Sequence, residues 1–113
     1  MAEAREAFRE RRKYARIATE QVISYSELGS SDQLGVGRDL STAGIRFEAV
    51  GCEIEQGQVI RVTFNIGTRT VVATGRVAWA TELDPLTTDI GLEFVDVDPS
   101  AMELIEDMVA TEA

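Results

Sequence analysis

Arginines cluster near the start of the chain in the pattern R-R-x-x-x-R, formed by Arg11, Arg12 and Arg16. Each guanidinium group presents a planar fork of donors that matches phosphate oxygens, and its flat face can stack on a purine. Three such groups on one short segment could clamp a nucleotide. Arginines four residues apart are also common on the solvated face of a helix, so this pattern alone leaves both interpretations open.

A second polar pattern, D-x-S-x-x-G, is formed by Asp39, Ser41 and Gly44. An ionised carboxylate such as that of Asp39 can accept both adjacent N–H donors on the Watson–Crick edge of guanine. Ser41 adds a hydroxyl for a phosphate or a base edge, and Gly44 permits a positive φ where the chain turns. The simpler interpretation is that Asp39 and Ser41 only make the local hydrogen bonds of a hairpin turn. Arg38 has two equal interpretations, because it could reach a ligand phosphate or simply pair with Asp39.

The composition excludes most familiar enzyme chemistry. Cys52 is the only cysteine and the chain has no histidine. An intrachain disulfide, a Cys/His zinc site and a histidine-based triad are therefore impossible. Asp84, Asp89 and Glu93 match no known metal-binding loop, and we interpret them as solvated charges. We expect no catalytic residues, no bound metal and no cofactor.

The charge is distributed unevenly along the chain. Residues 1–16 hold six basic and three acidic side chains, a net charge of +3. The other 97 residues hold five arginines and seventeen acidic side chains, a net charge of −12, which gives the formal total of −9. A basic end favours an anionic partner, whereas the acidic remainder would repel DNA, whose binding needs many phosphate contacts. The pattern favours a small anion over DNA.

The elements that must position these groups are mainly strands of one 113-residue domain. Apolar and polar residues alternate, with the period of a strand that has one buried face, in residues 45–49, 60–66, 70–80 and 90–94. Gly75 predicts a bulge or a close approach in the third of these segments. Two less regular strands are predicted at residues 17–26 and 34–40. Six short strands indicate a small antiparallel barrel or sandwich.

A helix is expected to end the chain. Asp98 precedes Pro99 at a favourable first helical position, and Ser100 with Glu103 could instead form a capping box. The apolar face of this helix is expected to cover the barrel. The first residues, 1–10, are predicted to be an N-terminal arm, and residues 11–113 to form the folded domain.

Taken together, these features resemble the PilZ domain family. R-R-x-x-x-R, a strand and then D-x-S-x-x-G form the signature of that family, and the resemblance extends from about Arg11 to Val109. Val77-Ala78-Trp79 is similar to its V-x-W strand, and Gly91-Leu92-Glu93-Phe94 is similar to its G-x-E/R-F strand. The resemblance implies a six-stranded antiparallel β-barrel with a C-terminal helix.

The resemblance also implies binding of the bacterial second messenger cyclic di-GMP. The phosphate and base-stacking role then falls on Arg12 and Arg16, assisted by Arg11. Guanine and phosphate contacts fall on Asp39, Ser41 and Gly44, with Arg38 as a further possibility. Trp79 is interpreted as a core or barrel-rim residue rather than one that stacks on the ligand.

The expected function is therefore that of a non-catalytic sensor. Binding folds the arginine arm over the ligand, and an unidentified downstream protein reads the changed surface. The alternative is a PilZ-like adaptor that has lost ligand binding and contacts only protein. Since no apolar run is long enough for a membrane span or a signal peptide, we expect a cytoplasmic monomer or homodimer without membrane insertion.

Overall fold

The computed structural model describes residues 16–27, 30–51 and 54–112. Arg11, Arg12, Cys52 and the expected arm of residues 1–10 lie outside this part of the chain. The elements are β1 (Ile17–Glu27), β2 (Gln33–Leu40), β3 (Gly44–Val50), β4 (Val59–Ile66), β5 (Arg69–Asp84), β6 (Thr87–Val97) and α2 (Pro99–Glu112).

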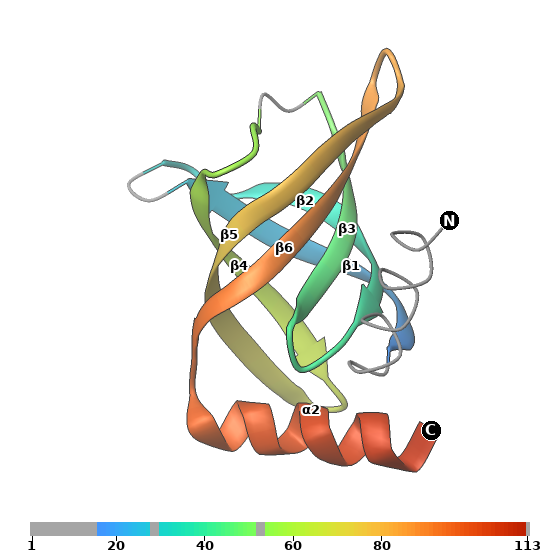
Figure 1. The fold of residues 1–113 in the computed structure, drawn as a ribbon, viewed down its shortest axis with the longest axis vertical. Coiled ribbons are helices and arrows are strands. Elements are labelled where there is room, and N and C mark those ends of the chain that lie inside the picture. The colour runs from blue at the N-terminus through green and yellow to red at the C-terminus, as the bar shows by residue number, and fades with distance from the viewer. Residues whose placement is uncertain (1–15, 28–29, 52–53, 113) are drawn as a thin grey trace, which may run out of the picture.

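The six strands close into an antiparallel barrel in the order β1-β2-β3-β6-β5-β4, with β4 paired back to β1 (Figure 1). Because the barrel closes, each strand has a hydrogen-bonded neighbouring strand on both sides over the body of the barrel. In an open sheet, the backbone N–H and C=O groups of the edge strands would need other partners. The predicted fold class, a six-stranded antiparallel β-barrel with a C-terminal helix, is confirmed. Both of the less regular strands form as β1 and β2.

The barrel interior is filled by alternate side chains of the strands. On β4, Ile60, Val62 and Phe64 are buried, and the residues between them are half-buried or exposed. Phe47 of β3 is fully buried, and its ring centroid lies 5.1 Å from that of Tyr25 on β1. Burial of each large apolar side chain stabilises the fold by roughly 1.5–3 kcal/mol. The strands therefore keep their register, and their outward positions remain available for polar groups.

Helix α2 lies across one end of the barrel (Figure 1), and its Ala101 and Ile105 are buried against it. Asp98 caps the helix as expected. Its Oδ1 accepts the Ser100 N–H at 3.4 Å, and its Oδ2 accepts from the Ser100 hydroxyl and from Arg69 Nη2, both at 2.9 Å. In the part of the chain that the structure describes, no helix is both long enough and apolar enough to cross a membrane.

The β5–β6 hairpin is longer than the sequence pattern predicts, because β5 continues to Asp84 and β6 begins at Thr87. The hairpin extends past the body of the barrel (Figure 1), where residues 81–86 are all exposed and alternation disappears. Nearer the body, the register shifts between Thr74 and Gly75, and an added Cβ on Gly75 would lie 2.6 Å from Leu92 Cγ. The glycine marks both a bulge and a close approach, as expected.

Candidate functional site

Four residues form one row across neighbouring strands on the outside of the barrel. Asp39 of β2 pairs with Arg46 of β3. Arg46 pairs with Gly91 of β6, which in turn pairs with Trp79 of β5. Because directly paired residues project from the same face of a sheet, the row brings a carboxylate, a guanidinium group and an indole together on one surface.

This row lines a pocket of about 150 Å³. The pocket is also lined by Arg16, just before β1, by Ser41 in the turn between β2 and β3, by Gly44 at the start of β3, and by Glu93. The structure therefore gathers at one pocket four of the five sequence-predicted residues that it describes, Arg16, Asp39, Ser41 and Gly44, but not Arg38. The other two predicted residues, Arg11 and Arg12, are outside the described part of the chain.

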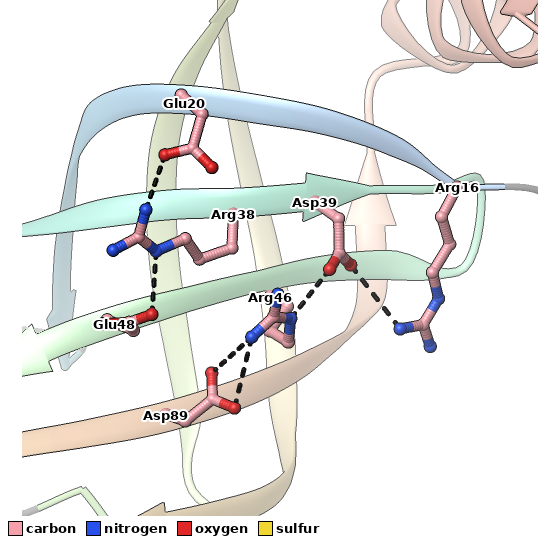
Figure 2. A network of polar contacts seen from close by, with 7 residues as sticks. All are labelled: Arg16, Glu20, Arg38, Asp39, Arg46, Glu48 and Asp89. Carbon is pink, nitrogen blue, oxygen red and sulfur yellow. Dashed lines mark hydrogen bonds and ion pairs between the residues drawn. The ribbon is translucent and has the colours of Figure 1, made fainter. Parts of the chain in front are cut away.

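Asp39 contacts an arginine through each of its carboxylate oxygens (Figure 2). Arg46 Nε donates to Oδ2 at 2.7 Å, and Arg16 Nη1 lies 3.5 Å from Oδ1. The Asp39 side chain is 21% exposed and that of Arg16 is 44% exposed. Asp39 therefore makes one short bond to an inner arginine and one longer ion pair to an arginine at the mouth of the pocket, rather than a local turn bond.

Arg46 is held from its other side by Asp89 of β6. Arg46 Nη1 lies 3.3 Å from both Asp89 oxygens, and the Asp89 side chain is only 15% exposed. The hydrogen bond to Asp39 raises the pKa of Arg46 above its ordinary value, and the charges of Asp39 and Asp89 act in the same direction. The interpretation of Asp89 as a solvated charge is wrong, because it anchors this arginine.

Ser41 is 5% exposed and organises the turn between β2 and β3. Its Oγ accepts the N–H groups of Ala43 and Gly44 at 3.1 and 3.3 Å, as in the simpler interpretation of the motif. The expectation of a positive φ at Gly44 is wrong, since the described glycines with positive φ are Gly51, Gly57 and Gly67. Gly44 is needed for space instead, because a Cβ there would collide with the Leu92 carbonyl oxygen of β6.

Trp79 is not a core residue, because it lies on the outside of the barrel and forms a wall of the pocket. Its side chain is among the exposed large hydrophobic groups, at 37%. A Cβ added to Gly91 would collide with the indole, so the ring lies over the backbone of β6 at that glycine. An indole with an accessible surface beside a guanidinium group can receive a planar base.

Arg38 lies next to Asp39 in the chain but outside this pocket. Its Nε donates to Glu48 at 2.8 Å, and its Nη1 pairs with Glu20 (Figure 2). Neither interpretation left open by the sequence describes this arrangement, because the guanidinium group pairs with Glu20 and Glu48 rather than with Asp39. We therefore leave Arg38 out of the candidate site.

The sequence reasoning missed Arg46, although a usable signal was present. A turn at residues 41–43 places Leu40 opposite Ile45 and Asp39 opposite Arg46. Counting outward from the turn would therefore have paired the motif carboxylate with an arginine on the neighbouring strand.

Comparison with known proteins gives the family. Residues 10–111 match the model of the PilZ domain, so the chain belongs to the PilZ family. Domains of this family commonly bind cyclic di-GMP and are typically non-catalytic receptors. No curated protein matches the sequence.

Solved structures share the fold. The inhibitor of motility MotI/DgrA of Bacillus subtilis has a TM-score of 0.78 and 13% identity over 90% of this chain, which spans 51% of that protein. The PilZ domain of YcgR from Escherichia coli, solved with c-di-GMP, has a TM-score of 0.68 and 18% identity over 89% of this chain and 90% of that domain. PlzA of Borreliella burgdorferi, in complex with c-di-GMP, has a TM-score of 0.59 and 13% identity over 96% of this chain and 56% of that protein.

Proposed function

We propose that this PilZ domain binds cyclic di-GMP in the pocket between Arg16, Asp39 and Trp79 and is a non-catalytic sensor of that messenger. The observation that carries the proposal is the joint placement of an ionised carboxylate, two guanidinium groups and an indole around one pocket of a PilZ barrel. Asp39 matches the guanine edge, Arg16 a phosphate and Trp79 the face of a base, while Arg46 holds Asp39.

The guanine edge is assigned to Asp39. Guanine presents two adjacent N–H donors, and each carboxylate oxygen has two lone pairs. Oδ2 can therefore keep the 2.7 Å bond from Arg46 while it accepts one guanine donor. Oδ1 accepts the other donor when Arg16, whose ion pair is longer and more exposed, moves away.

Arg16 then pairs with a ligand phosphate, together with Arg11 and Arg12. Charge-assisted bonds between guanidinium and phosphate groups replace the ion pair to Asp39. The Ser41 oxygen accepts its two bonds from backbone N–H groups, so its O–H can donate to a phosphate oxygen. Trp79 provides the surface for base stacking.

The size of the pocket supports a closing motion. About 150 Å³ is less than the roughly 300–1,000 Å³ of typical ligand sites. A dinucleotide therefore needs further walls, which the segment carrying Arg11 and Arg12 supplies on binding. We expect the folding of this segment over the ligand to change the surface beside the pocket, and a partner protein to read that change.

Calorimetric titration with cyclic di-GMP tests this function, with linear GMP and cyclic AMP as controls. Saturable binding of cyclic di-GMP that both controls fail to reproduce is the expected result. A cooperative thermal transition will show that the protein is folded. If the folded protein gives neither a heat of binding nor a change in tryptophan fluorescence with cyclic di-GMP, the adaptor alternative is favoured and the proposal is contradicted.

The Asp39→Asn variant tests the guanine contact. An amide replaces one acceptor with a donor that faces the guanine N–H groups, so we expect a large loss of affinity. Leu40→Ala is the comparison, because Leu40 is 1% exposed and its truncation should lower stability rather than specificity. Equal affinity of Asp39→Asn and the parent would remove Asp39 from the site.

A further inference from the structure

Arg46 joins two carboxylates that lie on different strands. Its Nε donates to Asp39 on β2 at 2.7 Å, and its Nη1 lies 3.3 Å from both oxygens of Asp89 on β6 (Figure 2). A guanidinium group is planar, so the direction of one bond constrains the direction of the other. Asp89 therefore helps to fix the plane of Arg46, and Arg46 in turn fixes the Asp39 carboxylate.

The two arginines on Asp39 are held differently. Arg46 comes from the middle of β3, is 33% exposed and has a second anchor in Asp89. Arg16 precedes β1, is 44% exposed and lies 3.5 Å from Asp39, its one recorded ion pair among the described residues. An exposed pair at that distance contributes little, so Arg16 can leave while Arg46 stays.

We propose that Arg46, anchored by Asp89, is the positioning residue that sets base specificity at this pocket, because it holds the Asp39 carboxylate in the orientation that accepts both guanine N–H groups. This inference rests on the proposed function. Two parallel hydrogen bonds require both oxygens to face the base edge, and a carboxylate free to rotate satisfies only one donor on average. If Arg46 no longer holds the Asp39 carboxylate, the preference for guanine over another base therefore falls more than the overall affinity for the dinucleotide.

A purely electrostatic role for Arg46 makes different predictions. Lysine keeps the charge of Arg46 but lacks the rigid fork, so Arg46→Lys would preserve an electrostatic contribution and lose the positioning. Asp89→Asn removes a negative charge beside the pocket. If charge alone mattered, this change would strengthen binding of any anionic dinucleotide and leave base discrimination unchanged.

Arg38 offers a matched control. Like Arg46, it is 33% exposed and pairs with two carboxylates on flanking strands, Glu20 and Glu48. It does not line the pocket. Arg38→Lys therefore makes the same chemical change in a similar surface network away from the base.

The experiment compares the affinities of the full chain for cyclic di-GMP and cyclic di-IMP, whose hypoxanthine bases lack the second N–H donor. For the parent, a bidentate contact predicts a preference for cyclic di-GMP of at least about fivefold. For Arg46→Lys and for Asp89→Asn the ratio should approach unity, while both variants keep the circular dichroism spectrum of the parent. For Arg38→Lys the ratio should stay within about twofold of the parent value.

Four results would overturn the inference. A parent-like ratio in both Arg46→Lys and Asp89→Asn would show that Arg46 does not position the carboxylate, and the proposed function would stand. Equal parent affinity for the two dinucleotides would also leave binding intact but show that Asp39 does not read the second donor. An equal loss of the ratio in Arg38→Lys would make the effect nonspecific. Failure of the parent to bind either dinucleotide would contradict the proposed function itself.

Discussion

The indole of Trp79 lies over Gly91, the residue with which it is directly paired on the neighbouring strand. An added Cβ on Gly91 would meet the Cε2, Nε1 and Cζ2 atoms of the ring. Only glycine leaves room for the Trp79 ring here, so the absence of a side chain at Gly91 determines the position of the ring that forms this wall of the pocket.

Gly91→Ala is expected to push the Trp79 ring away from β6 and to weaken cyclic di-GMP binding. The expected loss is about 1–3 kcal/mol, the usual value of one base stacked on an aromatic side chain. Trp79 is the only tryptophan, so its fluorescence emission reports the displacement directly, and calorimetry reports the affinity.

A double variant checks that the two residues act together. If Gly91→Ala acts by moving the ring, Gly91→Ala combined with Trp79→Ala should bind no more weakly than Trp79→Ala alone. Fully additive losses would mean that Gly91 contributes to the pocket without involving Trp79.

Arg16→Ala and Arg12→Ala should each weaken cyclic di-GMP binding by about 2–5 kcal/mol, the cost of truncating one side of an enclosed charge-assisted pair. The melting temperature of Arg16→Ala should change little, because Arg16 is 44% exposed and precedes the first strand. Arg61→Ala, at an exposed arginine on β4, is the control for loss of positive charge. Binding of either site variant within twofold of the parent would contradict the clamp.

Gly44→Ala should destabilise the protein by about 1–3 kcal/mol, because the new methyl group must displace the backbone of β6. The clash is with the carbonyl oxygen of Leu92, which no change of side-chain rotamer can relieve. Chemical denaturation measures the loss. Thr42→Ala, in the same turn, should stay close to the parent, and equal stabilities of Gly44→Ala and the parent would show that the two strands separate there without cost.

The cap of α2 predicts a pH dependence of stability. Hydrogen bonds from Ser100 lower the pKa of Asp98 below its ordinary value, and the charge of Arg69 acts in the same direction. A lowered pKa in the folded state means that Asp98 stabilises the fold above its unfolded pKa of about 4. This contribution is lost as the pH falls through the lower folded value.

Asp98→Ala should therefore lower the melting temperature at neutral pH, and its difference from the parent should shrink as the pH falls below about 4. Asp96→Ala, which removes a nearby exposed acidic side chain, controls for the change in net charge. A difference between Asp98→Ala and the parent that stays constant across this range would show that the cap does not depend on the charge of Asp98.

Much of the fold could be predicted because its signals are local. Alternation along residues 60–66 reports directly which side chains enter the barrel, and β4 has nearly the predicted bounds. The hairpin beyond Ala80 could not be predicted in this way, because both of its faces are exposed and its residues need not alternate. Strand closure depends on pairing between β1 and β4, which no local pattern specifies.

The site was predictable only in part, for the same reason. Asp39 and Ser41 belong to a contiguous motif, whereas Arg46, the partner of Asp39, lies on the neighbouring strand and Asp89 lies on a third strand. The position of the Trp79 ring depends on the missing side chain of Gly91, which a shifted register on the neighbouring strand places beneath it. Such relationships arise from register and bulges across several strands.

An NMR titration of the isotope-labelled chain with cyclic di-GMP detects binding and locates it in one measurement, so it tests whether the ligand occupies the pocket at Asp39. We expect saturable shifts of the Trp79 indole N–H, the Arg46 side-chain N–H and the backbone amides of Ser41 and Gly44, with small changes in the exposed face of α2. Saturable shifts confined to α2 or to the β5–β6 hairpin tip, or a spectrum that does not change at all, would show that cyclic di-GMP does not bind in this pocket.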